Sequence, residues 1–185
     1  MRYASCELLS LIGPSFLVSY SIGAVHPILL SDECPSLVVG SVNLEPGNIS
    51  FESYVENATS SVDQTAARPF GLTVTNLNSD PLVSNYTDLI TETVGEDTSA
   101  SRSCIQQSNS TANYTIHTLP NVVKVPYVAF TGEASLHITY AHCVINYPNQ
   151  VGVKTDWIKM ADVGVYGNAH FGYLELNNIA YFSFV

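Results

Sequence analysis

Residues 13–23 read GPSFLVSYSIG, an apolar run that is bounded by glycines and ends at Ser21. The Gly-Pro pair at its start breaks the preceding pattern, and Phe16–Val18 has the composition of a short buried strand. Gly23 stands two residues after Ser21, where a sharp turn from a strand into a helix needs a small residue. The stretch therefore predicts a strand, a tight turn at Ser21 and a helix from Ala24. An ordinary turn is the alternative interpretation, because Ser19 stands where the usual G-x-S-x-G pattern has glycine.

Length and composition favour a single globular domain. The chain has 185 residues, 46% of them hydrophobic, and a mean hydropathy of +0.16. Its net charge of −10 repels phosphate backbones, so we expect no nucleic-acid partner. Since every apolar run is shorter than the roughly 18–20 residues that cross a bilayer, we expect no membrane span.

The first 24 residues leave two interpretations open. A basic residue, an apolar stretch and small residues at the end are typical of a signal peptide, and cleavage after Ala24 would remove Ser21. Against this interpretation, Glu7 interrupts the apolar run and a Gly-Pro pair breaks it in the middle. The segment is better explained as the end of a helix, a turn and a strand.

Strands and helices alternate along most of the chain, which predicts parallel βαβ units. The expected strands cover Phe16–Val18, Leu37–Leu44, Val122–Phe130 and Val153–Met160, and the expected helices cover Ala4–Leu11, Ala24–Asp32, Tyr140–Tyr147 and Asn177–Val185. We therefore predict an α/β fold with a partial sheet of about four parallel strands and flanking helices. In such a sheet the ligand site lies outside the carboxyl ends of the strands. Four polar residues fall at these ends, namely Ser21, Glu45, Glu133 and His170.

Residues 46–120 differ in character, because Ser, Thr, Asn, Asp and Pro dominate there and long periodic patterns are missing. We predict an insertion with short helices, of which Tyr86–Val94 is the best candidate, and a disordered linker is the alternative. Five glycosylation sequons lie in this region, at Asn48, Asn57, Asn85, Asn109 and Asn113. They indicate a glycoprotein of the secretory pathway, where at least one disulfide is favoured. The four cysteines allow three complete pairings, and spacing does not select one.

Ser21, a carboxylate and His170 follow one another in the chain order of a catalytic triad on an α/β-hydrolase sheet. Serine is a poor nucleophile until an imidazole accepts its proton, and the carboxylate holds that imidazole in the correct tautomer. Each residue taken singly is explained as well by an ordinary structural role. The order and the placement at strand ends favour the catalytic interpretation.

The chain also resembles α/β-hydrolase serine esterases of the secreted bacterial and fungal kind. The matching stretches include LLSLIGPSFLVSYSIGA, VNLEPGN, RPFGLT and the tail from VPYVAFTGEASLH to ADVGVYGNAHFGYLELNN, in which G-N-x-H followed by L-E is the most specific part. The resemblance covers nearly the whole chain from Leu8 and aligns loosely over residues 50–120. It implies a single domain over residues 1–185, equivalent to the C-terminal half of such an enzyme, with 46–120 as a lid-like insertion.

Carried over residue by residue, the resemblance implies Ser21 as nucleophile, His170 as general base and the Ile22 N–H as an oxyanion donor. It implies Glu45 as the acid, and Glu133 is the alternative at the more general hydrolase position. It also implies a disulfide between Cys104 and Cys143, with a small-molecule ester as substrate and no cofactor.

The sequence departs from this family in two ways. Tyr20 and Ile22 stand where family members usually carry His and Gln, and Ala141 replaces a usual Asp.

His137, His142 and Cys143 have an unspecific spacing for a metal site, and the resemblance implies no metal.

The second departure concerns the first half of the fold and its oxyanion loop. The resemblance begins just before the nucleophile strand, and the chain has no H-G-G-like segment. Loss of one oxyanion donor typically costs about 10²–10³ in rate. We therefore expect a fragment of a longer secreted enzyme, with an open sheet edge that can self-associate. The alternatives are a catalytically inactive truncated remnant and a secreted glycoprotein with a binding role.

Overall fold

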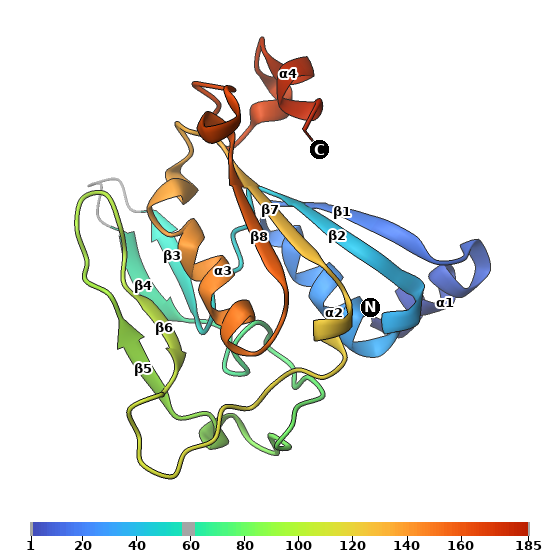
Figure 1. The fold of residues 1–185 in the computed structure, drawn as a ribbon, viewed down its shortest axis with the longest axis vertical. Helices are drawn as coiled ribbons and strands as arrows, with labels where there is room; N and C mark the ends of the chain where they lie inside the picture. The colour runs from blue at the N-terminus through green and yellow to red at the C-terminus, as the bar shows by residue number, and fades with distance from the viewer. Residues whose placement is uncertain (1, 57–61, 185) are drawn as a thin grey trace.

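The structure, a computed structural model, describes residues 2–56 and 62–184. A four-stranded parallel sheet is the centre of the fold, in the order β1-β2-β7-β8 (Figure 1). Its strands are β1 (Ser15–Tyr20), β2 (Val38–Leu44), β7 (Tyr127–Thr131) and β8 (Thr155–Lys159). The predicted partial α/β sheet is therefore confirmed.

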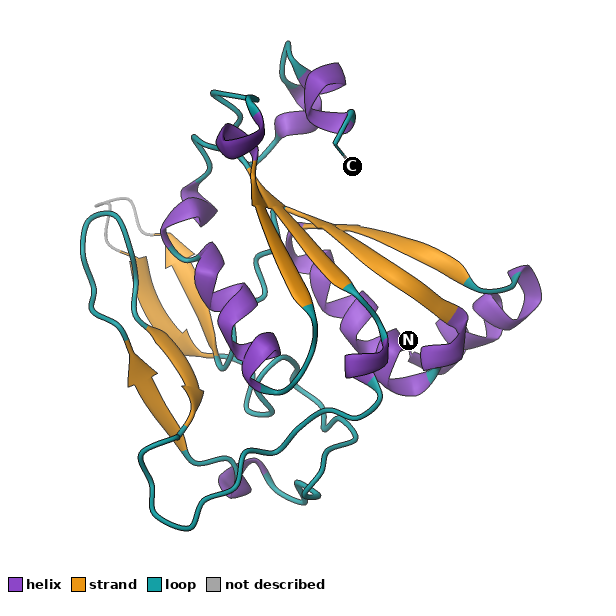
Figure 2. Ribbon diagram, in the orientation of Figure 1, coloured by secondary structure: helices purple, strands orange, loops and turns teal. Residues whose placement is uncertain are grey.

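Helices connect these strands and flank the sheet (Figure 2). Helix α2 (Val25–Glu33) links β1 to β2, and α3 (Ala141–Gln150) links β7 to β8. Helix α1 (Arg2–Ile12) precedes β1 and packs on α2, while the short α4 (Asn178–Phe182) lies near the carboxyl ends of the strands. Among the described residues, no helix has the length and apolar character needed to cross a bilayer.

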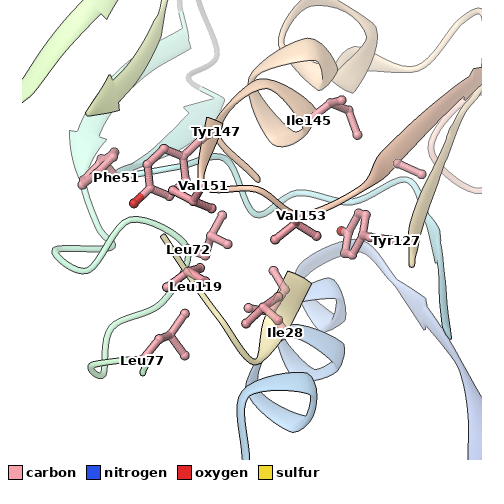
Figure 3. Packing of buried hydrophobic residues seen from close by; sticks show 12 residues of the cluster. Ile28, Phe51, Leu72, Leu77, Leu119, Tyr127, Ile145, Tyr147, Val151 and Val153 are labelled. Carbon is pink, nitrogen blue, oxygen red and sulfur yellow. The ribbon is translucent and has the colours of Figure 1, made fainter. Parts of the chain in front are cut away.

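Alternation along β7 divides the hydrophobic core between the two faces of the sheet. Tyr127 and Ala129 face the main core, where α2, α3 and residues of the 46–120 region meet, whereas Phe130 faces a smaller core beside Tyr181 of α4. The main core (Figure 3) is made of Ile28, Phe51, Leu72, Leu77, Leu119, Val122, Tyr127, Ala129, Ile145, Tyr147, Val151 and Val153.

Proline explains why one predicted strand is shorter than expected. The pattern predicts a strand over Val122–Phe130, but residues Val122–Lys124 form the 3₁₀ turn η4 and β7 starts only at Tyr127. Pro126 has no N–H for the sheet ladder and restricts the residue before it, so the strand begins after the proline.

The region 46–120 contains hairpins where short helices are predicted. Strands β3 (Glu52–Glu56) and β4 (Val62–Ala66) pair antiparallel, as do β5 (Thr91–Val94) and β6 (Cys104–Gln107). The predicted helix over Tyr86–Val94 is wrong: Asn85 and Asp88 form a capping box around the single 3₁₀ turn η3 (Tyr86–Asp88). The following Thr-Glu-Thr-Val segment is rich in β-branched residues, which favour an extended strand.

The described part of this region is not a structureless linker, because Leu72, Leu77 and Leu119 belong to the main core. Strand β6 packs on α3, on the side away from β1 (Figure 1). Its function as a lid remains a prediction.

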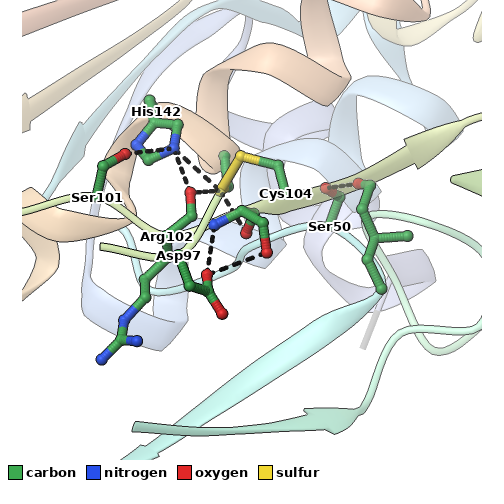
Figure 4. The surroundings of a disulfide bond; sticks show 9 residues. Ser50, Asp97, Ser101, Arg102, Cys104 and His142 are labelled. Atoms are coloured by element: carbon green, nitrogen blue, oxygen red, sulfur yellow. Dashed lines mark hydrogen bonds between the residues drawn. A yellow bond between two sulfur atoms is a disulfide. The ribbon is translucent and has the colours of Figure 1, made fainter. Parts of the chain in front are cut away.

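Two disulfides connect these elements. Cys104 and Cys143 join β6 to α3 with an S–S distance of 2.06 Å, and this is the pair that the resemblance implies (Figure 4). Cys6 and Cys34 join α1 to the end of α2. The described cysteines are therefore all paired.

Candidate active site

Ser21 lies directly after β1, as the first residue of the 3₁₀ turn η1 (Ser21–Ala24). Its φ of 55° is in the left-handed region, which a residue with a Cβ seldom adopts. The Gly47 N–H donates to the Ser21 carbonyl oxygen over 3.3 Å and helps to fix the turn. The predicted tight turn is therefore present. A serine, and not the glycine that usually adopts this backbone conformation, stands at its first residue.

His170 meets Ser21 from the loop that follows β8. The distance from His170 Nε2 to Ser21 Oγ is 3.0 Å, which is hydrogen-bond geometry. Tyr20 supports the loop, because its hydroxyl donates to the His170 carbonyl oxygen at 2.8 Å and its ring lies 5.0 Å from the imidazole.

A polar network holds the backbone just before His170. The Ala169 N–H donates to Glu175 Oε1 at 2.8 Å, and the Asn168 amide donates to Glu175 Oε2 at 2.7 Å and to Asn177 Oδ1 at 2.8 Å. In the sequence this part of the site is visible only as the distinctive G-N-x-H…L-E pattern, which indicates no role for Asn168 or Glu175.

Glu45 lies directly after β2, also with a left-handed φ of 50°, and is 1% exposed. The Gly132 N–H donates to Oε1 at 2.6 Å, and the Ser135 hydroxyl donates to Oε2 at 2.5 Å. Burial raises the pKa of Glu45 to about 7, against the lowering effect of these two bonds. Near neutral pH the carboxyl group is therefore divided between its charged and neutral forms.

The acid and the base are close but not hydrogen-bonded. Glu45 Oε2 lies 3.8 Å from His170 Nδ1, which exceeds a hydrogen-bond distance. Glu133, the alternative acid, is exposed, and its carboxylate accepts the Gly167 N–H at 3.0 Å instead. Of the two carboxylates that the sequence offers, Glu45 is the one that faces His170.

A second histidine, His137, lies beside this pair. Its ring centroid is 4.4 Å from that of His170, and its Nδ1 is 3.9 Å from Glu45 Oε2. Burial and the nearby His170 lower the pKa of His137 to about 4, so the ring is neutral at physiological pH. The sequence places His137 only near His142 and Cys143, at a spacing that is unspecific for a metal site.

The backbone packs closely behind Glu45. A Cβ added at Gly132 would lie 2.2 Å from the carbonyl oxygen of Asn168, so only glycine lets the two loops approach this closely. The same glycine, which directly follows β7, supplies an N–H to Glu45 and so positions both the acid and the loop that carries His170. Ile22 follows Ser21 in η1 and its side chain is exposed.

Among the described residues, two groups of side chains have ligand atoms close enough to hold a metal ion. Cys104, His142 and Cys143 form one group, but its sulfurs are joined in a disulfide. Glu45, His137 and His170 form the other. His137 thus belongs to a different group from His142 and Cys143, so these three residues do not share one cluster of ligand atoms.

The predicted glycosylation sites differ in accessibility. Asn85, Asn109 and Asn113 are exposed, whereas Asn48 is 1% exposed. Because a glycan needs an accessible amide, the folded chain has no place for one on Asn48, and that prediction is wrong for the folded state. Asn57 lies outside the described residues.

Comparison with known proteins found a fungal relative. The chain is 29% identical over 177 residues to "Probable secreted lipase phiG" from Fungal sp. (strain ATCC 74256), covering 95% of this chain and 46% of the relative. No protein-family model matches the chain.

Two solved structures are similar as well. A novel bacterial esterase has a TM-score of 0.51 at 14% identity, covering 96% of this chain and 38% of its own. The chain is thus similar to a lipase in sequence and to an esterase in fold, as the resemblance seen in its sequence implies. A pyrethroid hydrolase from Sphingobium faniae JZ-2 has a TM-score of 0.45 at 13% identity, with 100% and 76% coverage. The chain thus spans less than half the length of the fungal relative and of the bacterial esterase.

Proposed function

We propose that this chain contains the catalytic residues of a carboxylic ester hydrolase that acts through Ser21, His170 and Glu45. The observation that carries the proposal is the 3.0 Å contact between Ser21 Oγ and His170 Nε2. It is made by a serine with a left-handed backbone directly after a strand, which is the geometry of an activated nucleophile on an α/β sheet. The lipase and esterase names of the similar proteins support an ester as the substrate class.

In this mechanism Ser21 Oγ attacks the ester carbonyl carbon while His170 Nε2 takes the hydroxyl proton. The electron pair of the carbonyl π bond moves to the oxygen, to which the Ile22 N–H donates. The bond to the alcohol oxygen then breaks, and His170 returns the proton to the leaving alcohol. A water molecule, activated by His170 in the same way, releases the carboxylic acid and restores Ser21.

Glu45 orients the imidazole in this scheme. For His170 Nε2 to accept the serine proton, its Nδ1 must carry a hydrogen, and Glu45 Oε2 is the oxygen that faces this atom. A hydrogen bond between these atoms requires the 3.8 Å separation to shorten by about 1 Å. Catalytic hydrogen bonds are often long in a free enzyme and tighten in the complex with substrate.

We also propose that the chain acts as part of a longer, secreted enzyme, whose further strands pair with β1. This is supported by its coverage of 46% of the fungal relative, which is described as secreted. The outer strand β1 exposes Phe16 by 69% and Val18 by 66%, beside a groove lined also by His26 and Pro27. Two disulfides and three exposed sequons fit the secretory pathway.

The mass of the native protein tests this extension. We expect a single polypeptide well above the 20.0 kDa of the present chain. A native monomer of 20.0 kDa would contradict the proposal, and a dimer of that chain would instead indicate pairing of two β1 edges.

A fluorophosphonate probe, which forms a covalent bond to an activated serine, tests the catalytic proposal. We expect labelling of the purified chain at Ser21, mapped by peptide mass spectrometry, and loss of labelling in Ser21→Ala. Ser19→Ala is the matched control, because Ser19 lies two residues away and its hydroxyl donates to Asn43 Oδ1 at 2.6 Å rather than to a histidine. This variant should label like the unmodified chain.

The state of the sample decides how a negative result is interpreted. Far-UV circular dichroism and a cooperative thermal transition establish that each protein is folded. The chain and the native protein are therefore both labelled, and if neither reacts at Ser21 although both are folded, the esterase proposal is rejected in favour of a catalytically inactive relative. Equal labelling of Ser21→Ala and the unmodified chain would reject Ser21 as nucleophile.

A further inference from the structure

Two imidazole nitrogens face one carboxylate oxygen in the candidate active site. His137 Nδ1 and His170 Nδ1 lie 3.9 Å and 3.8 Å from Glu45 Oε2, and the ligand atoms of the three residues lie within 4.8 Å of one another. The proposed ester hydrolysis uses only one of these imidazoles. The second, His137, requires another explanation.

His137 is buried in an unusual way. The residue is 6% exposed, and its Nδ1 is inaccessible and makes no hydrogen bond of standard geometry, although backbone groups of Glu45 and Pro46 interact with the ring. Buried polar atoms almost always have a hydrogen-bond partner, because leaving one unsatisfied destabilises the folded state. This nitrogen points toward Glu45 and so toward the other two ligand atoms.

Two imidazole nitrogens and one carboxylate oxygen are a common ligand set of zinc, with a fourth position left for water. Metal–ligand bonds of about 2.0–2.2 Å in a tetrahedron place ligand atoms about 3.4 Å apart. The measured 3.8 Å and 3.9 Å exceed this separation by only a few tenths of an ångström. Magnesium and calcium prefer sites made of oxygen alone, so the nitrogen ligands favour a transition metal.

The surrounding residues support this use of Glu45. Gly132 and Ser135 hold its carboxylate through one hydrogen bond to each oxygen, as the outer partners of a metal ligand commonly do. His170 lies on a loop and its side chain is 16% exposed, so it can shift toward the other two ligands.

We propose that Glu45, His137 and His170 form a binding site for a divalent transition metal such as Zn²⁺, which reversibly inactivates Ser21. With the metal on Nδ1, the His170 proton moves to Nε2, the nitrogen that faces Ser21 Oγ. That nitrogen then donates a hydrogen bond and no longer accepts the serine proton. The inhibition rests on the proposed esterase function, whereas the metal site does not.

Direct metal binding is the first test. Untagged protein, stripped with EDTA and dialysed, is titrated with Zn²⁺ by isothermal calorimetry. We expect one Zn²⁺ per chain, and an affinity lowered by about 100-fold or more in His137→Gln, because even an outer partner of a ligand contributes 10–100-fold. His142→Gln is the matched control and should bind like the unmodified chain, since His142 belongs to the group whose sulfurs form a disulfide.

A second variant is needed in case His137→Gln disturbs the packing of the site. His137→Phe keeps an aromatic ring against His170 and Tyr140, whose rings lie 4.4 Å and 5.0 Å from that of His137, and thus preserves packing if His137→Gln does not fold. Zn²⁺ binding that survives in a folded His137 variant, or fails in the unmodified chain, overturns the site.

Fluorophosphonate labelling with and without Zn²⁺ tests the inhibition. We expect Zn²⁺ to suppress Ser21 labelling of the unmodified chain and EDTA to restore it, while any labelling of the His137 variants stays insensitive to Zn²⁺. Zn²⁺ binding that leaves Ser21 labelling unchanged overturns the inhibition. A chain that binds Zn²⁺ but never labels rejects the esterase function and leaves the metal site standing, so the two failures are distinguishable.

Discussion

At the scale of single residues, the site brings together side chains that are far apart in the sequence. Ser21 and His170 are 149 positions apart, yet they meet at 3.0 Å because each follows a strand of one parallel sheet. The left-handed backbone at Ser21 and at Glu45 concentrates strain at two of the three residues. Such strain persists only where the surrounding structure enforces it, and it commonly marks functional sites.

The identity of the acid can be tested by two matched substitutions. In Glu45→Gln the amide cannot stabilise a charged His170, so we expect kcat for p-nitrophenyl acetate to fall by about 10²–10⁴ with little change in KM. Glu133→Gln changes the other candidate, which is exposed and binds the Gly167 N–H, and should alter kcat by about two-fold at most. The reverse order of effects would assign the acid to Glu133.

At the scale of elements, sequence analysis succeeded where apolar periodicity is strong. The four parallel strands and helices α1, α2 and α3 were predicted, because each contains a run or repeat of apolar residues, most of them bounded by Gly or Pro. The hairpin of β5 and β6 was missed, because β5 is mostly exposed and carries no alternating apolar pattern. Its position depends on the disulfide between Cys104 and Cys143 and on contacts with α3.

The strength of the local sequence pattern also explains which residues of the candidate site could be predicted. Ser21, Glu45 and His170 were identified because the carboxyl ends of parallel strands are recognisable in the sequence. Tyr20 and His137 were not, since their roles depend on contacts that only the folded chain creates. In the sequence His137 shortly precedes the predicted helix over Tyr140–Tyr147, and nothing there indicates a neighbouring imidazole.

At the scale of the whole molecule, Asp32 connects three parts of the chain. It lies in α2 and is 1% exposed. Its carboxylate accepts hydrogen bonds from the backbone and side-chain N–H groups of Asn78, at 3.1 Å and 3.2 Å, and pairs with Arg2 of α1 at 3.4 Å. Asp32 therefore ties α1 and the 46–120 region to α2, which contributes Ile28 to the main core.

This connection predicts how stability depends on pH. Burial raises the pKa of Asp32, and the bonds from Asn78 and the charge of Arg2 only partly oppose this effect. Because the pKa of Asp32 in the folded chain is above the unfolded value of 3.8, the folded chain binds the Asp32 proton more tightly than the unfolded chain does. The contribution of Asp32 to the free energy of unfolding therefore falls as the pH rises from 3.8 through the folded pKa. Above that pKa the contribution is constant.

Asp32→Asn removes this titration. The free energy of unfolding is measured by urea denaturation between pH 3.5 and 7. We expect the value for the variant, minus that for the unmodified chain, to increase as the pH rises. Asp156→Asn, at an exposed position in β8, is the matched control and should run parallel to the unmodified chain. Parallel curves for Asp32→Asn would mean that Asp32 has the same proton affinity in the folded and unfolded states. The hydrogen bonds from Asn78 and the charge of Arg2 would then fully offset the effect of burial on the pKa of Asp32.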